Sequence, residues 1–301
     1  MNSPSSTFDQ DATKHALVLG GGGSAGNAWL LGVLAGFAES GVDLTGAARI
    51  IGTSAGATAA AQLTGATPAA LYEAACQPMT GKSPPGSRAV SPAHGTVNLL
   101  AATDEISAAA NSPADMRRRI GAMALQAAPS SDTAAQERWR ATVAARLPEH
   151  RWPSHELLIT AVDADTGSPK VFHKQSGVAL VDAVAASCSN GFAYSIGGHR
   201  YIDGGYRRNE NADLAAGCAH VVVLAPFAGR TRHPLSWAMQ LDAQLDELRE
   251  TGSKVFTIYP EASSAHLFGA SAMDYSLRPQ AARAGYAQGL ARAAEFANVF
   301  G

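Results

Sequence analysis

The chain has 301 residues, of which 46% are hydrophobic and 16% charged, and its formal net charge is −2. This composition is typical of a globular chain and, without a block of basic residues, it argues against a nucleic-acid partner. The cysteines, Cys76, Cys188 and Cys218, are widely spaced and predict neither a disulfide framework nor a metal site, so we expect a cytoplasmic protein. Residues 1–14 lack an apolar segment and are expected to form a flexible tail before a single domain over residues 15–301.

Strand and helix patterns alternate at the start of that domain. The run "HALVLG" predicts a buried strand, and a second strand is expected around Ile50 and Ile51. A helix is expected after the first strand, because the segment there carries apolar residues at helical spacing: Trp29, Leu30, Val33, Leu34 and Phe37. A second helix is expected after the second strand, from about Ala55 to Thr64. This order predicts right-handed crossovers and a largely parallel sheet.

Residues 67–148 carry helical patterns without a strand pattern, and a loop rich in Pro, Gly and Ser interrupts them at 80–95. Strands are expected again at "ELLITAVDA", "KVFHK", "RYID", "HVVVLAP" and "KVFTIYP", and a helix is expected at the end of the chain. The sequence therefore predicts one α/β domain with a helical insertion over residues 67–148, which could cover the functional site as a lid.

The stretch "RIIGTSAGATAAA" runs an apolar strand into a Gly-x-Ser-x-Gly motif formed by Gly52, Ser54 and Gly56. Such a motif can place a serine on a sharp strand-to-helix turn, where its hydroxyl is exposed for nucleophilic attack. It can also be a glycine-rich corner that happens to contain a serine. The motif alone does not choose between these interpretations.

A glycine run, "LGGGGSAG", covers residues 19–26 between the first strand and its helix. Bare backbone N–H groups at a helix N-terminus can hold an anion, which could be a permanent phosphate or the transient oxyanion of acyl transfer. Gly21, Gly23 and Gly26 also match the dinucleotide fingerprint G-x-G-x-x-G. That fingerprint requires an acidic residue at the end of the next strand, whereas Asp43 precedes that strand.

The third feature is "YIDGGYRRNENADLA", in which Asp203 precedes Gly204 and Gly205. An Asp-Gly pair is most often a simple turn. The three features together, in this order, resemble the patatin-like phospholipase family from about His15 to Phe227, and "AVAASCSNG" and "NADLA" resemble further family blocks. The resemblance implies a three-layer α/β/α fold with a mostly parallel central sheet (patatin or FabD–lysophospholipase-like), lipid acyl hydrolysis, and no metal or other cofactor.

The resemblance also assigns roles to residues. It implies a catalytic dyad of Ser54 and Asp203, without a histidine. It implies an oxyanion hole formed by the backbone amides of Gly21, Gly22, Gly23 and Ala55. The elbow at the serine needs small neighbours, which are Gly52 and Gly56. The motif residues that support the aspartate are Gly204, Gly205 and Asn211. The expected partner is a lipid or other acyl ester, met through transient contact with a membrane surface, and the oligomeric state is not predicted.

Three positions depart from the family pattern. Ala25 stands near the place of a basic residue, while Asn190–Gly191 and Ala212 stand where prolines are usual. The missing cation weakens the expectation of an anionic headgroup, so a neutral ester, a thioester or a lysolipid remains open.

Alternative functions also remain open. The same dyad could serve an acyltransferase or a thioesterase, and the glycine run could serve a nucleotide-binding protein. A catalytic triad would need one of the later histidines, His220, His233 or His266, as its base.

Overall fold

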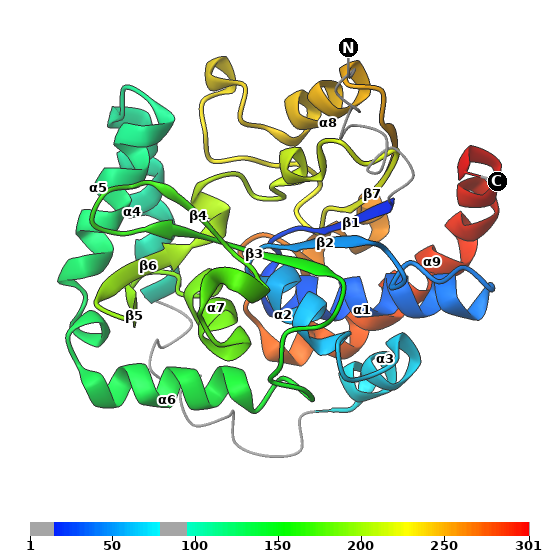
Figure 1. The fold of residues 1–301 in the computed structure, drawn as a ribbon, viewed down its shortest axis with the longest axis horizontal. Coiled ribbons are helices and arrows are strands. Elements are labelled where there is room, and N and C mark those ends of the chain that lie inside the picture. The colour runs from blue at the N-terminus through cyan, green and yellow to red at the C-terminus, as the bar shows by residue number, and fades with distance from the viewer. Residues whose placement is uncertain (1–14, 79–94, 301) are drawn as a thin grey trace, which may run out of the picture.

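A computed structural model describes residues 15–78 and 95–300 (Figure 1). The expected tail over residues 1–14 and nearly all of the expected hinge-like loop at 80–95 lie outside the described residues. In the described part, eight strands form one mixed sheet in the order β5-β6-β3-β2-β1-β7-β8, and β4 pairs with β3.

The centre of the sheet is parallel. It consists of β1 (His15–Leu19), β2 (Arg49–Gly52), β3 (Glu156–Asp163), β7 (His220–Leu224) and β8 (Lys254–Ile258). Their sequences are nearly continuous apolar runs because helices cover both faces of a parallel sheet. The rest of the sheet is antiparallel and consists of β4 (Pro169–Phe172), β5 (Tyr194–Ile196) and β6 (His199–Asp203).

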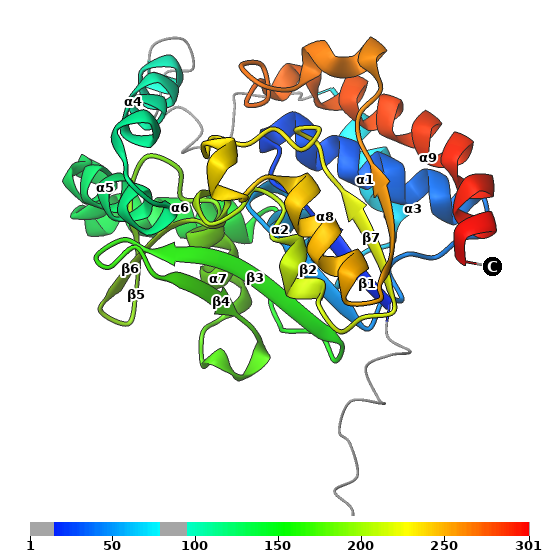
Figure 2. The ribbon, with the colours of Figure 1, turned by 90° about the horizontal axis from the view of Figure 1, so that it is seen from above.

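Helices cover the two faces of the sheet and give three layers, as predicted (Figures 1 and 2). One face is covered by α1 (Gly23–Glu39), α2 (Ala55–Gln62), α3 (Pro68–Cys76), α7 (Leu180–Ser187) and α9 (Arg278–Phe300). The other face packs against α8 (Leu241–Glu250) and α5 (Pro113–Gln126). No helix within the described ranges is both long and apolar enough to cross a membrane.

The first and last helices of the domain are in backbone contact, and Figure 2 shows α9 lying along α1. A Cβ atom at Gly32 of α1 would lie 2.1 Å from the Ala282 carbonyl oxygen, and one at Gly289 of α9 would lie 2.3 Å from that of Val33. Side chains at these two positions would force the helices apart. The helix that begins at the glycine run is therefore covered by the C-terminal helix.

The helical insertion is spread over several layers. Its first helix, α3, packs against α1 and α9. Met116 and Ile120 of α5 pack against Val162 of the sheet. In α6 (Thr133–Ala144), the Trp139 Nε1 donates to the Ala185 carbonyl of α7 at 3.0 Å.

The remaining helix of the insertion, α4 (Gly95–Ala109), lies beside the loop that follows α7. Its Leu99 side chain is so close to Gly191 that a Cβ there would lie 2.9 Å from the Leu99 Cδ2. Of the insertion helices, α4 is therefore the one to consider as a cover for the site.

Candidate active site

Ser54 occupies a strained turn between β2 and α2. Its φ is 53° and its ψ is −113°, in the positive-φ region that residues with a side chain rarely adopt. The flanking glycines are sterically required: a Cβ at Gly56 would lie 1.9 Å from the Leu19 carbonyl oxygen, and one at Gly52 would lie 2.6 Å from the Ala57 Cα. The Gly-x-Ser-x-Gly segment thus folds as the sharp elbow that its sequence predicts.

The sheet register brings Asp203 to the same edge of the sheet. Gly52, the last residue of β2, pairs with Ile159 of β3, and Asp203, the last residue of β6, pairs with Ala161 only two residues further along β3. The two side chains are near enough that Ser54 lowers the pKa of Asp203. The structure therefore brings together two residues that lie far apart in the sequence.

Asp203 is buried, with only 8% of its surface exposed. Its Oδ1 accepts a hydrogen bond from the Gly205 N–H at 2.8 Å, and its own N–H donates to the Ser189 carbonyl at 3.0 Å. Burial raises the pKa of Asp203 to about 6, although hydrogen bonds from Gly205 and Ser54 and the charge of Arg232 act in the opposite direction. A carboxylate with this pKa is a stronger base than a free aspartate and is still ionised at neutral pH.

The glycine run lies beside the elbow and keeps several amides available. Within the described ranges, the N–H groups of Gly22, Gly23 and Ala55 have no hydrogen-bond acceptor. The N–H of Gly21, in contrast, donates to the Asn209 carbonyl at 3.0 Å. This leaves three of the four expected oxyanion-hole amides available, because that of Gly21 is already bonded.

Neighbouring loops hold the glycine run in place. A Cβ at Gly22 would lie 2.6 Å from the Pro226 Cβ, and one at Gly23, whose φ is +64°, would lie 2.7 Å from the Ala272 carbonyl oxygen. Only glycine fits these positions, so the conformation that exposes the amides is fixed by packing on both sides.

Asn211 joins the elbow to the turn after Asp203. This residue is fully buried in a left-handed conformation with φ 56°. Its Nδ2 donates to the Thr53 Oγ1 at 2.9 Å, next to Ser54, and to the Gly204 carbonyl at 3.3 Å, next to Asp203. The family motif residue Asn211 therefore holds together the two segments that carry the predicted dyad.

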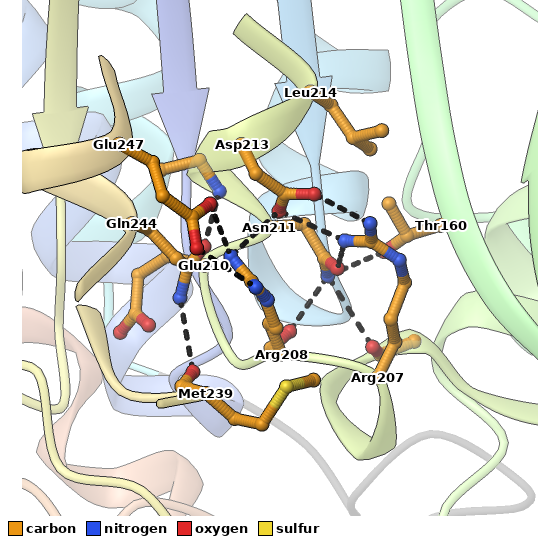
Figure 3. A network of polar contacts seen from close by, with 12 residues as sticks. Thr160, Arg207, Arg208, Glu210, Asn211, Asp213, Leu214, Met239, Gln244 and Glu247 are labelled. Carbon is orange, nitrogen blue, oxygen red and sulfur yellow. Dashed lines mark hydrogen bonds and ion pairs between the residues drawn. The ribbon is translucent and has the colours of Figure 1, made fainter. Parts of the chain in front are cut away.

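A network of charged residues surrounds this asparagine (Figure 3). Arg207 donates to the Asn211 Oδ1 at 2.6 Å and pairs with Asp213. Arg208 pairs with Glu247 of α8 at 3.0 Å. These contacts fasten the loop after Asp203 to the helical layer beneath it.

The residue at the usual proline position, Ala212, has an N–H that donates to the Gln244 Oε1 of α8 at 2.7 Å. A proline could not make this hydrogen bond. The alanine at this position therefore allows a hydrogen bond to α8 that the usual proline would prevent.

The candidate histidines lie in other contacts. His220 is the first residue of β7 and faces His15, at the end of the parallel strands opposite to the end that carries Ser54. His266 contacts Gln280, and His233 contacts Thr231. Burial, with the charge of Arg117, lowers the pKa of His233 to about 4. None of these arrangements has the serine–histidine–carboxylate geometry of a triad.

Sequence reasoning did not identify Ser187 and interpreted Cys188 as a small buried residue, yet both hold Ser54 from the side of α7. The Ser54 N–H donates to the Ser187 Oγ at 2.9 Å, and the Cys188 Sγ donates to the Ser54 carbonyl at 3.2 Å. Burial raises the pKa of Cys188 to about 12, so this thiol stays neutral. The block "AVAASCSNG" was the available signal, but it does not indicate which atoms meet.

The layered sheet and the elbow after its central strand place the chain in the class of α/β ester hydrolases. A family model described as patatin-like phospholipase matches residues 17–216, which is more than half of the 301 residues. The chain belongs to the patatin-like phospholipase family and is a lipid ester hydrolase of that family.

Comparison with the curated proteins gives no match. Among solved structures, the chain is similar to VipD from Legionella pneumophila, with 14% identity, a TM-score of 0.44, and coverage of 94% of this chain and 67% of that chain. It is also similar to the type III effector protein ExoU, with 16% identity, a TM-score of 0.41 and coverage of 95% of this chain and 53% of that chain. This chain thus spans about half the length of ExoU.

Proposed function

We propose that the chain hydrolyses lipid acyl esters with Ser54 as nucleophile and Asp203 as general base. The observation that carries this proposal is the strained, half-buried serine, which the sheet register brings to the level of a buried carboxylate whose pKa is raised to about 6. The free amides of Gly22, Gly23 and Ala55 are the proposed oxyanion hole.

In the proposed mechanism, Asp203 accepts the Ser54 proton as the Ser54 Oγ attacks the ester carbonyl. The negative charge that forms on the carbonyl oxygen is stabilised by the free backbone amides. Asp203 then gives the proton to the departing alcohol, which leaves an acyl-enzyme. Finally, Asp203 activates a water molecule that releases the fatty acid and restores the Ser54 hydroxyl.

We further propose that α4 forms a wall of the acyl-chain site. Leu99 lies against the loop at Gly191, and Arg232, whose charge acts on Asp203, donates to the Thr103 Oγ1 of α4. This helix is therefore connected through Arg232 to the surroundings of Asp203 and lies against the loop after α7.

A fluorophosphonate probe tests the nucleophile directly. The wild type should be labelled and should hydrolyse p-nitrophenyl esters, whereas Ser54→Ala should lose both properties with its fold intact. The matched control is Ser131→Ala, because Ser131 is an exposed serine whose hydroxyl reaches only the Ala128 carbonyl within the described part of the chain. Labelling of the Ser54→Ala protein at the wild-type rate would refute the assignment.

The base is tested by comparing Asp203→Asn with three histidine variants. The dyad predicts that Asp203→Asn is as inactive as Ser54→Ala, while His220→Ala, His233→Ala and His266→Ala keep substantial turnover. A folded histidine variant with the activity of Ser54→Ala would instead require a triad. Repeating the assay with an added alcohol or amine acceptor separates hydrolysis from acyl transfer.

A further inference from the structure

Two arginines near the glycine run have no carboxylate partner. Arg278, the first residue of α9, donates from Nη1 to the Ser24 carbonyl at 2.9 Å and to the Asn27 Oδ1 at 3.1 Å. Arg146, which follows α6, donates from Nη2 to the Tyr275 hydroxyl at 2.8 Å. Over residues 15–78 and 95–300, no Asp or Glu oxygen lies within 4.0 Å of either guanidinium.

Both arginines are connected to the residue after the proposed nucleophile. The Asn27 side chain accepts from Arg278 and donates to the Ala55 carbonyl at 3.4 Å. It also donates to the Gln62 Oε1 at 3.1 Å, and the Gln62 amide donates to the Arg146 carbonyl at 3.2 Å. One chain of hydrogen bonds thus links α9, α1, α2 and the segment after α6 beside the elbow.

The charge of Arg146 also reaches the other side of the elbow. It lowers the pKa of Cys188 against the larger effect of burial, and the Cys188 thiol donates to the Ser54 carbonyl. The positive charge of Arg146 therefore acts in the surroundings of Ser54.

The two like charges are held close together in a half-buried place. Burial lowers the pKa of Arg278, and the charge of Arg146 lowers it further. Arg146 is fixed in position by the rings of Trp139 and Tyr275, whose centroids lie 5.7 and 5.9 Å from its guanidinium carbon. Holding two cations side by side, partly out of water and without an anion, costs free energy that a bound anion would offset.

The guanidinium groups also have donors to spare. Among the described residues, nothing accepts a hydrogen bond from the Nε or Nη2 of Arg278. Guanidinium groups bind phosphate oxygens through pairs of parallel N–H donors, and the Tyr275 hydroxyl, which accepts from Arg146, can donate as well. The pair therefore has the charge and the donors that a phosphate group requires.

We propose that Arg146 and Arg278 form a subsite that binds the phosphate group of the lipid ester while its acyl carbonyl lies at Ser54. This inference rests on the proposed function and extends it, because it assigns a phosphate-bearing acyl ester as the preferred substrate over a neutral glyceride. The two arginines contribute to binding and positioning, and the bond-breaking chemistry stays with Ser54 and Asp203.

The test compares two substrates that share one acyl chain, palmitoyl-lysophosphatidylglycerol and monopalmitoylglycerol, at equal presentation in mixed micelles. The measured quantity is the ratio of their kcat/KM values. In Arg146→Gln and in Arg278→Gln this ratio should fall about tenfold or more, mainly through KM for the phosphate-bearing substrate. The lysine variants should recover part of it, and Arg283→Gln, an exposed arginine of the same helix, should keep the wild-type ratio.

A binding measurement separates this inference from the proposed function. Calorimetry on the Ser54→Ala protein should detect binding of glycerol 3-phosphate and of inorganic phosphate. The added substitution Arg278→Gln should weaken the binding of both compounds. If Ser54→Ala hydrolyses esters like the wild type, the proposed nucleophile is wrong, while arginine-dependent phosphate binding still supports the subsite. If both glutamine variants are folded by thermal unfolding and keep the wild-type ratio, the subsite for the lipid phosphate is refuted, even where inorganic phosphate binds.

Discussion

Replacing Asp203 with asparagine should abolish ester turnover and, at pH 8, make the protein more stable. Asparagine has nearly the same shape and its carbonyl can still accept the hydrogen bond from the Gly205 N–H. It cannot accept a proton or carry a charge, however. The substitution therefore removes the proposed base and also removes a carboxylate that is kept ionised in a buried place.

The size of the stabilisation follows from the pKa. Burial raises the pKa of Asp203 from 3.8 to about 6, and each pKa unit corresponds to about 1.4 kcal/mol. Between these two values the folded protein binds more protons than the unfolded chain, so the contribution of this group to stability falls as the pH rises. Below the pKa of the unfolded chain, the asparagine variant and the wild type should have the same free energy of unfolding. Above pH 6 that of the variant should be higher by about 3 kcal/mol.

The assay is chemical denaturation of both proteins between pH 4 and pH 8, together with initial rates on a short-chain ester. The matched control is Glu210→Gln, because Glu210 is 1% exposed and burial raises its pKa to about 7. The stability of that variant relative to the wild type should also increase as the pH rises, but its turnover should stay at the wild-type level. An Asp203→Asn protein that is less stable than the wild type at pH 8, or that still hydrolyses the ester, would refute the reasoning.

Three further predictions follow from other parts of the structure. Ser54→Gly should be more stable than Ser54→Ala by about 1 kcal/mol in urea unfolding, since glycine tolerates the φ of 53° at this position. Gly32→Ala should lower the free energy of unfolding by about 2 kcal/mol or more, because its Cβ would lie 2.1 Å from the Ala282 carbonyl oxygen, while Gly46→Ala, where the nearest atom is 3.8 Å away, should change little. Turnover should rise as the substrate passes from monomers to micelles if α4 covers the acyl site, and equal rates on both forms would count against this role.

The sequence predicted the central sheet from short, local signals, and it assigned roles to the pair of site residues through three motifs whose order resembles the family. Continuous apolar runs indicated the buried parallel strands, and Ser54 and Asp203 each lie in a motif of a few residues. The helix α8 also had a readable signal, with leucines at 241, 245 and 248, but it was not predicted. The helix α7 lacks a side-chain cap and is buried almost throughout, and β5 has three residues, so neither carried a clear pattern.

Other features depend on contacts across the chain that spacing cannot indicate. The Gly21 amide is bonded to Asn209, which comes 188 residues later. The absence of a basic residue near Ala25 suggested a site without a cation, yet Arg278 brings positive charge to the carbonyl of Ser24 across 254 residues. Such pairings are set by the packing of α9 on α1 and become visible only in the folded chain.

The packing of α9 on α1 also has a consequence for the timing of activity during synthesis. The helix α1, which starts at the glycine run, is covered by α9, which is synthesised after all eight strands of the described sheet. Until that helix docks, the Gly32 face of α1 has no partner, and the contact between Arg278 and Ser24 cannot form. Because a domain folds as a unit, a nascent chain would lack the complete site until α9 has been synthesised and has docked.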